Sequence, residues 1–147
     1  MSAELNPPEL AEAINAKGFP GAAGVRIVAI KPGYAEIALA RRDDLLQFFG
    51  HFFGGVITSL ADHAAGMAIT SALPKGKIGV TVELKVNFLS PADGAELIAR
   101  AKTLKMSGSI SVATIELFSK KEGAETLCAF GTATMRAMDL PAELRPR

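Results

Sequence analysis

The 147-residue chain contains no tryptophan, one tyrosine and a single cysteine, Cys128. One cysteine excludes an intrachain disulfide framework and a cysteine-rich metal cluster, and it fits a reducing compartment. The basic residues are scattered and the formal net charge is only +1. Because nucleic-acid-binding surfaces need clustered Lys and Arg, often with stacking aromatic residues, we expect no nucleic-acid partner.

Long apolar runs are missing as well. The uncharged stretch 48–61 is interrupted by three glycines and a histidine, so no segment is apolar enough to span a bilayer. Residues 1–6 lack the basic and then apolar pattern of a signal peptide. We therefore expect a cytoplasmic protein with no membrane partner.

What is present indicates one folded domain over residues 1–147. The chain is 49% hydrophobic and 21% charged, which is ordinary for a folded protein. A domain of this size buries only about two-thirds of its unfolded surface. A subunit interface is therefore the expected place for the remaining apolar residues.

The pattern along the chain predicts one α+β domain. Residues 7–17 predict a short N-terminal helix, with Asn6 as its candidate cap and Pro7 at the first helical position. Small or helix-breaking residues are expected to end that helix: Gly18, Pro20 and Gly21. Segments with strand-like patterns follow at 25–31, 34–40, 78–89, 96–106, 109–119 and 125–136.

Between the second and third strands, residues 54–73 predict one long helix that is apolar almost all round, which indicates a helix enclosed by other elements. Short turns between the later strands favour antiparallel pairing. The economical arrangement is a curved antiparallel sheet wrapped around this central helix. In strand 78–89 apolar and polar residues alternate, which assigns Thr81 to the polar face.

Only two side chains of the central helix ionise, Asp62 and His63. A carboxylate buried without a partner costs several kcal/mol, so Asp62 is expected to be paired, protonated, exposed at an interface, or used in catalysis. Helical spacing places it on a stripe of small and hydroxyl-bearing residues: Gly55, Thr58, Ser59 and Gly66. A purely structural carboxylate, bonded to a hydroxyl or backbone group at a subunit contact, remains the alternative.

The same helix is expected to begin at Gly54-Gly55, where the first backbone N–H groups have no intrahelical acceptors. Glycine allows a substrate to approach the backbone closely. N–H groups at such a position would polarise a thioester carbonyl and stabilise its developing oxyanion.

From Gln47 to Asp62 the chain resembles, without a gap, the motif of hotdog-fold acyl-CoA thioesterases of the phenylacetate-degradation (PaaI-like) type. That motif reads Asn or Gln, two residues, Gly, two residues, His-Gly-Gly, then Leu-x-Asp. Residues 79–92 are similar to the strand that follows the central helix in the family. The order of elements agrees from about Gly24 onward.

The resemblance implies a hotdog homodimer, often doubled to a homotetramer, with two sheets joined through strand 78–89 and an acyl-CoA hydrolysed at the dimer interface. Asp62 would be the nucleophile or the general base that activates water. Gly54 of the other subunit would donate its N–H to the thioester oxygen, Gln47 would orient substrate or water, and Thr81 would assist with the water. Coenzyme A is part of the substrate, and no further cofactor is implied.

Phe53 departs from the motif, because it stands where the family usually has histidine. This departure motivates an alternative function, a non-catalytic acyl-CoA binding or sensing protein. A third reading is an enoyl-CoA hydratase or dehydratase, although His51 and Asp62 do not match the spacing those enzymes use. We expect His51 to be a loop residue and His63 a structural contact.

Two further expectations concern metals and the acyl pocket. The chain has no His-x-x-x-His and no pair of cysteines, so no metal site is expected. Phenylalanines before the helix are expected to border a pocket for an apolar or aromatic acyl group, with some of them in the core: Phe48, Phe49, Phe52 and Phe53.

Overall fold

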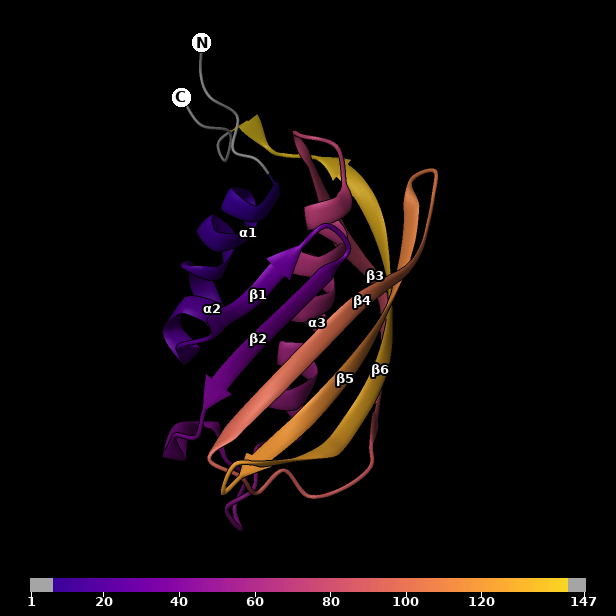
Figure 1. The fold of residues 1–147 in the computed structure, drawn as a ribbon. Helices are drawn as coiled ribbons and strands as arrows, with labels where there is room; N and C mark the ends of the chain where they lie inside the picture. The colour runs from indigo at the N-terminus through magenta and orange to yellow at the C-terminus, as the bar shows by residue number, and fades with distance from the viewer. Residues whose placement is uncertain (1–6, 143–147) are drawn as a thin grey trace.

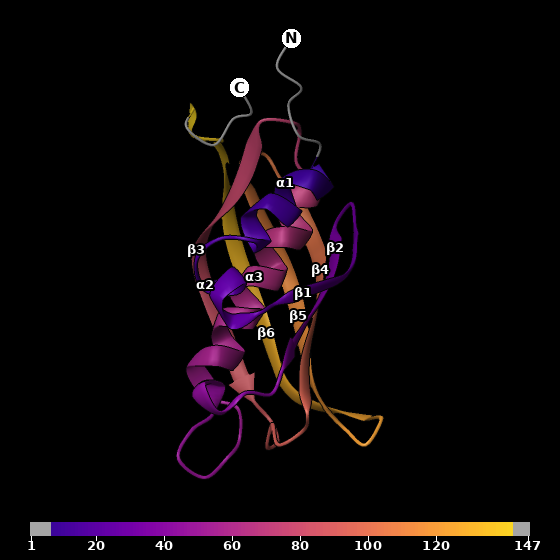
Figure 2. The same cartoon turned by 90° about the vertical axis from the view of Figure 1, so that its left-hand side faces the viewer.

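The computed structural model describes residues 7–142. Its elements are α1 (Pro7–Asn15), α2 (Gly18–Ala23), β1 (Arg26–Lys31), β2 (Tyr34–Ala40), a 3-10 turn at Asp43–Leu45, α3 (Gly54–Ala72), β3 (Lys77–Phe88), β4 (Glu96–Ser107), β5 (Ile110–Lys121) and β6 (Ala124–Asp139). The strands form one antiparallel sheet in the order β1-β2-β4-β5-β6-β3. Figures 1 and 2 show α3 running along one face of this curved sheet. The predicted α+β arrangement is confirmed.

The N-terminal helical region differs from the prediction. α1 covers most of the segment 7–17, and the candidate cap Asn6 lies outside the described residues. The glycines and proline expected only to end α1 instead belong to a second helix, α2. Gly18 takes a φ of +59°, which reverses the chain direction and lets a new helical turn begin. The prediction missed α2 because six residues give too short a pattern to read.

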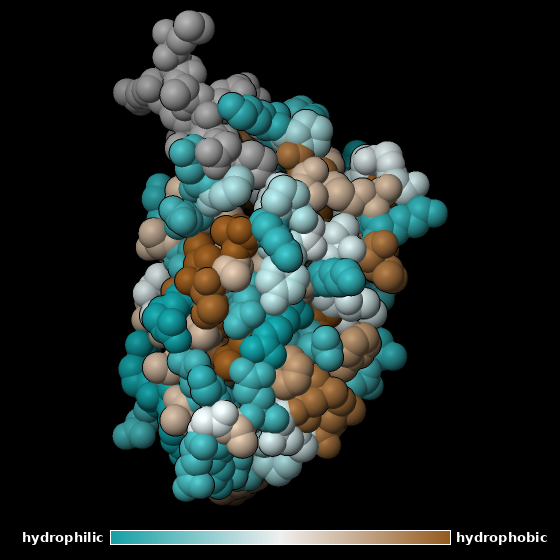
Figure 3. Space-filling model, in the orientation of Figure 1, coloured by the Kyte–Doolittle hydropathy of each residue, from teal (hydrophilic) through white to brown (hydrophobic). Residues whose placement is uncertain are grey.

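The core lies between α3 and the inner face of the sheet. Its largest fully buried side chains come from the helix and from four strands: Ile37, Leu39, Leu60, Ile69, Leu97, Ile115, Leu117 and Met135, with Cys128 and Ser119. The outer face is more polar. There Arg100 pairs with Glu36 and Glu125, and Figure 3 shows hydrophilic residues across the middle of this face between separate apolar patches.

A β-bulge in β3 changes which side chains face the helix. Thr81 pairs with Met135, whereas Glu83 pairs with Thr134, so Val82 is an extra residue in β3. Met135 is buried against the helix, so Thr81 points to the same inner side. The assignment of Thr81 to the polar face is therefore wrong, since regular alternation holds only until the bulge.

The central helix is less enclosed than its composition predicted. Buried residues occupy the sides of α3 that meet the sheet, but one stripe stays partly accessible in the single chain: Gly54, Gly55, Thr58, Ser59, Asp62, His63 and Gly66. None of the helices in residues 7–142 combines the length and hydropathy that a membrane span requires. The accessible stripe positions the candidate site.

Candidate active site

Asp62 lies in the middle of the accessible stripe of α3. The two hydroxyls before it are turned back onto the helix, since Thr58 donates to the Gly54 carbonyl over 2.9 Å and Ser59 to the Gly55 carbonyl over 2.7 Å. Neither hydroxyl therefore bonds the carboxylate. The small residues around Asp62 leave space beside it, as the sequence predicted.

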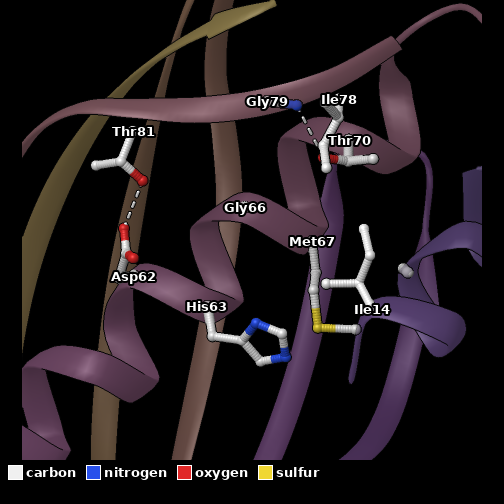
Figure 4. Close-up of a pocket in the computed structure, with 10 residues that line it drawn as sticks. Ile14, Asp62, His63, Gly66, Met67, Thr70, Ile78, Gly79 and Thr81 are labelled. Carbon is white, nitrogen blue, oxygen red and sulfur yellow. Dashed lines mark hydrogen bonds between the residues drawn. The ribbon is translucent and has the colours of Figure 1, made fainter. Parts of the chain in front are cut away.

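The Asp62 carboxylate has one partner in the described chain, the hydroxyl of Thr81. Thr81 Oγ1 donates to Asp62 Oδ1 over 2.7 Å, and Figure 4 shows the two side chains pointing toward each other from α3 and β3. No Lys or Arg within residues 7–142 forms an ion pair with this carboxylate, and no described group donates to Oδ2. One oxygen is thus held in place while the other is available to a water or a substrate.

A pocket of about 160 Å³ opens beside this pair. Its walls come from α1, α3 and β3, and Figure 4 shows their side chains around the space: Ala11, Ile14, Asp62, His63, Gly66, Met67, Thr70, Ile78, Gly79 and Thr81. Asp62 and Thr81 mark its polar end, whereas Ile14, Met67 and Ile78 make part of it apolar. Ile14 was not among the site residues predicted from the sequence. Its only signal was its position in the predicted N-terminal helix.

Gln47 lies in the loop before α3, and its carboxamide is fixed by that loop. The backbone N–H of Phe49 donates to Gln47 Oε1 over 2.9 Å, and the N–H of His51 donates over 3.3 Å. Since both partners are donors, the oxygen must face the loop. The NH2 group has no acceptor within residues 7–142, so Gln47 presents donors outward.

The first turn of α3 presents a second set of donors. Phe53 is the N-cap, and the N–H groups of Val56 and Ile57 donate to its carbonyl over 2.9 and 3.1 Å. The N–H groups of Gly54 and Gly55 have no acceptor among the described residues. These two amides therefore offer a positively polarised backbone site at the helix N-terminus.

The four candidate residues fall into two separate pairs in the single chain. Gln47 lies in the loop before α3 and Gly54 at its first position, whereas Asp62 lies at the middle of α3 with Thr81 of β3 beside it. Asp62 lies eight positions after Gly54, which is about 12 Å along the axis of the helix. One chain therefore does not bring the amide donors and the carboxylate to one reacting carbonyl.

Comparison with known proteins identifies the family to which the chain belongs. The model of the Thioesterase superfamily matches residues 49–126, more than half of the chain. The chain belongs to the Thioesterase superfamily. A thioesterase family protein from Silicibacter pomeroyi has the same fold, with a TM-score of 0.88 and 30% identity, covering 91% of this chain and 99% of that one.

Two other relatives agree with a hotdog thioesterase of the PaaI-like type. A mutant of the phenylacetic acid degradation protein PaaI from Thermus thermophilus superposes with a TM-score of 0.70 at 29% identity, covering 80% of this chain and 96% of that one. The 1,4-dihydroxy-2-naphthoyl-CoA hydrolase of Listeria monocytogenes is 27% identical over 71% of this chain and 85% of its own length. The chain is thus a hotdog thioesterase, a thioester hydrolase by family.

His63 of this thioesterase is a structural contact between α3 and α1. Its Nε2 lies 2.8 Å from Asn15 Oδ1, while Asn15 Nδ2 donates to the Val25 carbonyl over 2.9 Å. The Asn15 oxygen must accept, so His63 donates through Nε2. Burial lowers the pKa of His63 below 6.5, and the neighbouring Asp62 carboxylate opposes this only in part.

The lowered pKa of His63 predicts a pH dependence of stability. Between the folded and the unfolded pKa the unfolded chain binds more protons, so the free energy of unfolding rises with pH there. Stability is complete above about 6.5 and is lost as the pH falls through the folded pKa. We expect His63→Gln to flatten the curve of unfolding free energy against pH below 6.5 in denaturant titrations. An unchanged slope in this variant would contradict the assignment.

The phenylalanine pocket predicted from the sequence is not formed within the described single chain, and at a subunit contact it stays a prediction. Phe52 is 3% exposed and belongs to the core, whereas Phe48, Phe49 and Phe53 are 96%, 59% and 54% exposed. None of the four lines the described pocket. Phe52 confirms that some of these phenylalanines belong to the core, and the loop before α3 leaves the other three at the surface of the single chain.

Cys128 is buried in β6, and burial raises the pKa of its thiol to about 11, so the thiol stays protonated at neutral pH. It therefore acts as a small apolar residue, not as a nucleophile. Within residues 7–142 no three His, Cys, Asp or Glu side chains gather closely enough to hold a metal ion. That no cofactor takes part stays a prediction.

Proposed function

We propose that this thioesterase hydrolyses an acyl-CoA thioester at sites that two subunits share. The observation that carries the proposal is the separation of the two candidate pairs along α3. Asp62 and Thr81 have a pocket but no amide donors beside them, while Gly54 and Gln47 have donors that no described group accepts. A second copy of the chain that presents the start of its α3 to the pocket would bring the amide donors of one pair to the carboxylate of the other.

The edge of the sheet supports a homodimer. β3 is the last strand in the sheet order, so one side of its backbone has no neighbouring strand within residues 7–142. Pairing of β3 with its copy would join two sheets edge to edge. Val80 and Val82 on β3 are 44% and 62% exposed, and such pairing would set them beside side chains of the copy and reduce their exposure. We extend the proposal to a homotetramer built from two such dimers, in the cytoplasm.

The proposed reaction uses each group where it lies. Asp62 takes a proton from a water that attacks the thioester carbon, or it attacks that carbon itself to form a mixed anhydride that water then hydrolyses to the free acid. Thr81 holds Asp62 Oδ1 through its proton and accepts a hydrogen bond from the water. The N–H of Gly54 and the NH2 of Gln47, both from the partner, donate toward the carbonyl oxygen, which becomes negative as the bond to water forms. The carbon–sulfur bond then breaks, and the CoA thiolate takes up the proton.

The acyl group is proposed to be apolar and to enter the described pocket. Ile14, Met67 and Ile78 supply apolar surface, and a pocket of about 160 Å³ is comparable to a cavity of roughly 150 Å³ that takes one benzene ring. The Listeria relative is named for a substrate that carries a ring system on CoA. A compact or aromatic acyl group therefore fits better than a long chain.

The test is release of free thiol by the purified protein from a panel of acetyl-, phenylacetyl-, benzoyl-, decanoyl- and palmitoyl-CoA. We expect turnover, and slower turnover with the N-acetylcysteamine thioester of the same acyl group, which lacks most of CoA. Binding of acyl-CoA without turnover of any member would instead establish a non-catalytic binding protein. Addition of water to an enoyl-CoA without thiol release would establish a hydratase.

A further inference from the structure

The loop between the 3-10 turn and α3 is irregular, and hydrogen bonds within the loop hold only part of it in place. The N–H of Gly50 donates to the Gln47 carbonyl over 3.0 Å, and the N–H of Gln47 donates to the His51 carbonyl over 2.8 Å. Gly50 has a φ of +90°, a left-handed conformation that favours glycine. No backbone N–H within residues 7–142 donates to the Gly50 carbonyl, so its donor comes from outside the loop.

Arg41 provides that donor. Its Nη2 donates to the Gly50 carbonyl over 2.5 Å, and its Nη1 reaches the Asp93 carbonyl at 3.4 Å. The backbone N–H of Arg41 donates to the Ala95 carbonyl over 2.8 Å, which fixes the residue just beyond the end of β2. Arg41 thus joins three segments far apart in the sequence: the end of β2, the loop before α3 and the loop before β4.

The guanidinium of Arg41 is committed to backbone carbonyls and not to a carboxylate. No salt bridge involving Arg41 occurs within residues 7–142, whereas Arg42 next to it pairs with Asp44. A charged donor gives a stronger bond to a carbonyl than a neutral one does. Removing Arg41 would free the Gly50 carbonyl, and with it the turn that holds the Gln47 carboxamide.

We propose that Arg41 is a positioning residue that holds Gln47 in register with the free amides of Gly54 and Gly55. Its side chain does not touch the pocket, so it acts through the loop and not on the substrate. This inference rests on the proposed function, because Gln47 matters to catalysis only if the thioester carbonyl lies beside it. Arg41 lies outside the stretch from Gln47 to Asp62 that resembles the family motif.

The kinetic test compares Arg41→Ala with Gln47→Ala and with the double variant. We expect Arg41→Ala to lower kcat by roughly ten- to a hundredfold with a smaller change in KM, because misplacement of a donor costs transition-state stabilisation. If Arg41 acts through Gln47, the double variant will be no slower than Gln47→Ala alone. Losses that multiply in the double variant would overturn the inference. Arg41→Lys should restore part of the rate.

Arg42→Ala is the matched control, because Arg42 also donates to backbone carbonyls, those of Ala22 and Ala23, both over 3.3 Å. We expect it to lower the melting temperature at least as much as Arg41→Ala while leaving kcat unchanged. An equal fall in kcat for both variants would show a general loss of stability and contradict the inference.

A second measurement does not depend on activity, so it separates this inference from the proposed function. The amides of Phe49 and His51 bond the Gln47 oxygen. We expect their hydrogen exchange, followed by NMR, to accelerate in Arg41→Ala and to stay as in the wild type in Arg42→Ala. Unchanged exchange in Arg41→Ala would overturn the positioning role even if thiol release and its dependence on Asp62 were as proposed.

Discussion

Asp62→Asn is expected to lower kcat for thioester hydrolysis by about a thousandfold, within the range of 10²–10⁴ for loss of a general base. The amide keeps the size of the side chain and still accepts the proton of Thr81, so the fold should be unaffected. It cannot take a proton from water and is a poor nucleophile. KM should change little, because Asp62 acts on the reacting atoms and the pocket walls stay in place. Thiol release under saturating acyl-CoA measures the effect.

Asp44→Asn is the control for Asp62→Asn, since Asp44 is an exposed carboxylate outside α3 that pairs with Arg42. It should keep full activity. Thr81→Val removes the hydroxyl that holds Asp62, and its kcat should lie between that of Asp44→Asn and that of Asp62→Asn. If Asp62→Asn hydrolysed acyl-CoA at the wild-type rate, Asp62 would be only a structural carboxylate at the surface of the helix.

Gly54→Pro is expected to lower kcat by about 10²–10³, the loss measured when one oxyanion donor is removed. The substitution deletes the N–H of Gly54 and little else. Gly54 is the first residue of α3, where proline is favoured, and Phe53 before it has an extended backbone with φ −61° and ψ 136°, which proline accepts. The helix should therefore form, and far-UV circular dichroism should match the wild type.

Gly54→Ala separates the loss of the N–H from the addition of side-chain atoms. A Cβ at this position would lie 3.5 Å from the nearest ring atom of Phe88, an ordinary contact, so the variant should fold and keep its amide donor. We expect it to retain most of the wild-type kcat. Equal losses in Gly54→Ala and Gly54→Pro would mean that space at Gly54, and not its N–H, limits the reaction.

The sequence predicted the regular elements well and the local irregularities poorly. Alternation and turn residues located all six strands, and the apolar run 54–73 located α3, because both follow from side-chain periodicity. The bulge at Val82 was not predictable, since valine continues the alternation and only pairing with β6 shows that it is extra. Thr81 was therefore assigned to the wrong face.

The sequence also predicted only part of the candidate site. An isolated carboxylate on a stripe of small residues singled out Asp62, and the structure adds its contact with Thr81 and the pocket beside it. The orientation of the Gln47 carboxamide was not predictable, because it depends on the loop amides that donate to its oxygen. Arg41 carries no signal in the sequence, because its partner is a backbone carbonyl that every residue possesses.

Activity of a mixed dimer would test most directly whether two subunits share each site. Chains carrying Asp62→Asn and Gly54→Pro are coexpressed with different affinity tags, and the heterodimer is isolated by both tags. One of its two sites then combines an intact Asp62 with an intact Gly54 from the other chain, so we expect about half of the wild-type activity, although each homodimer is nearly inactive. A heterodimer as inactive as both homodimers would contradict the account, because it would place both groups of a site on one chain.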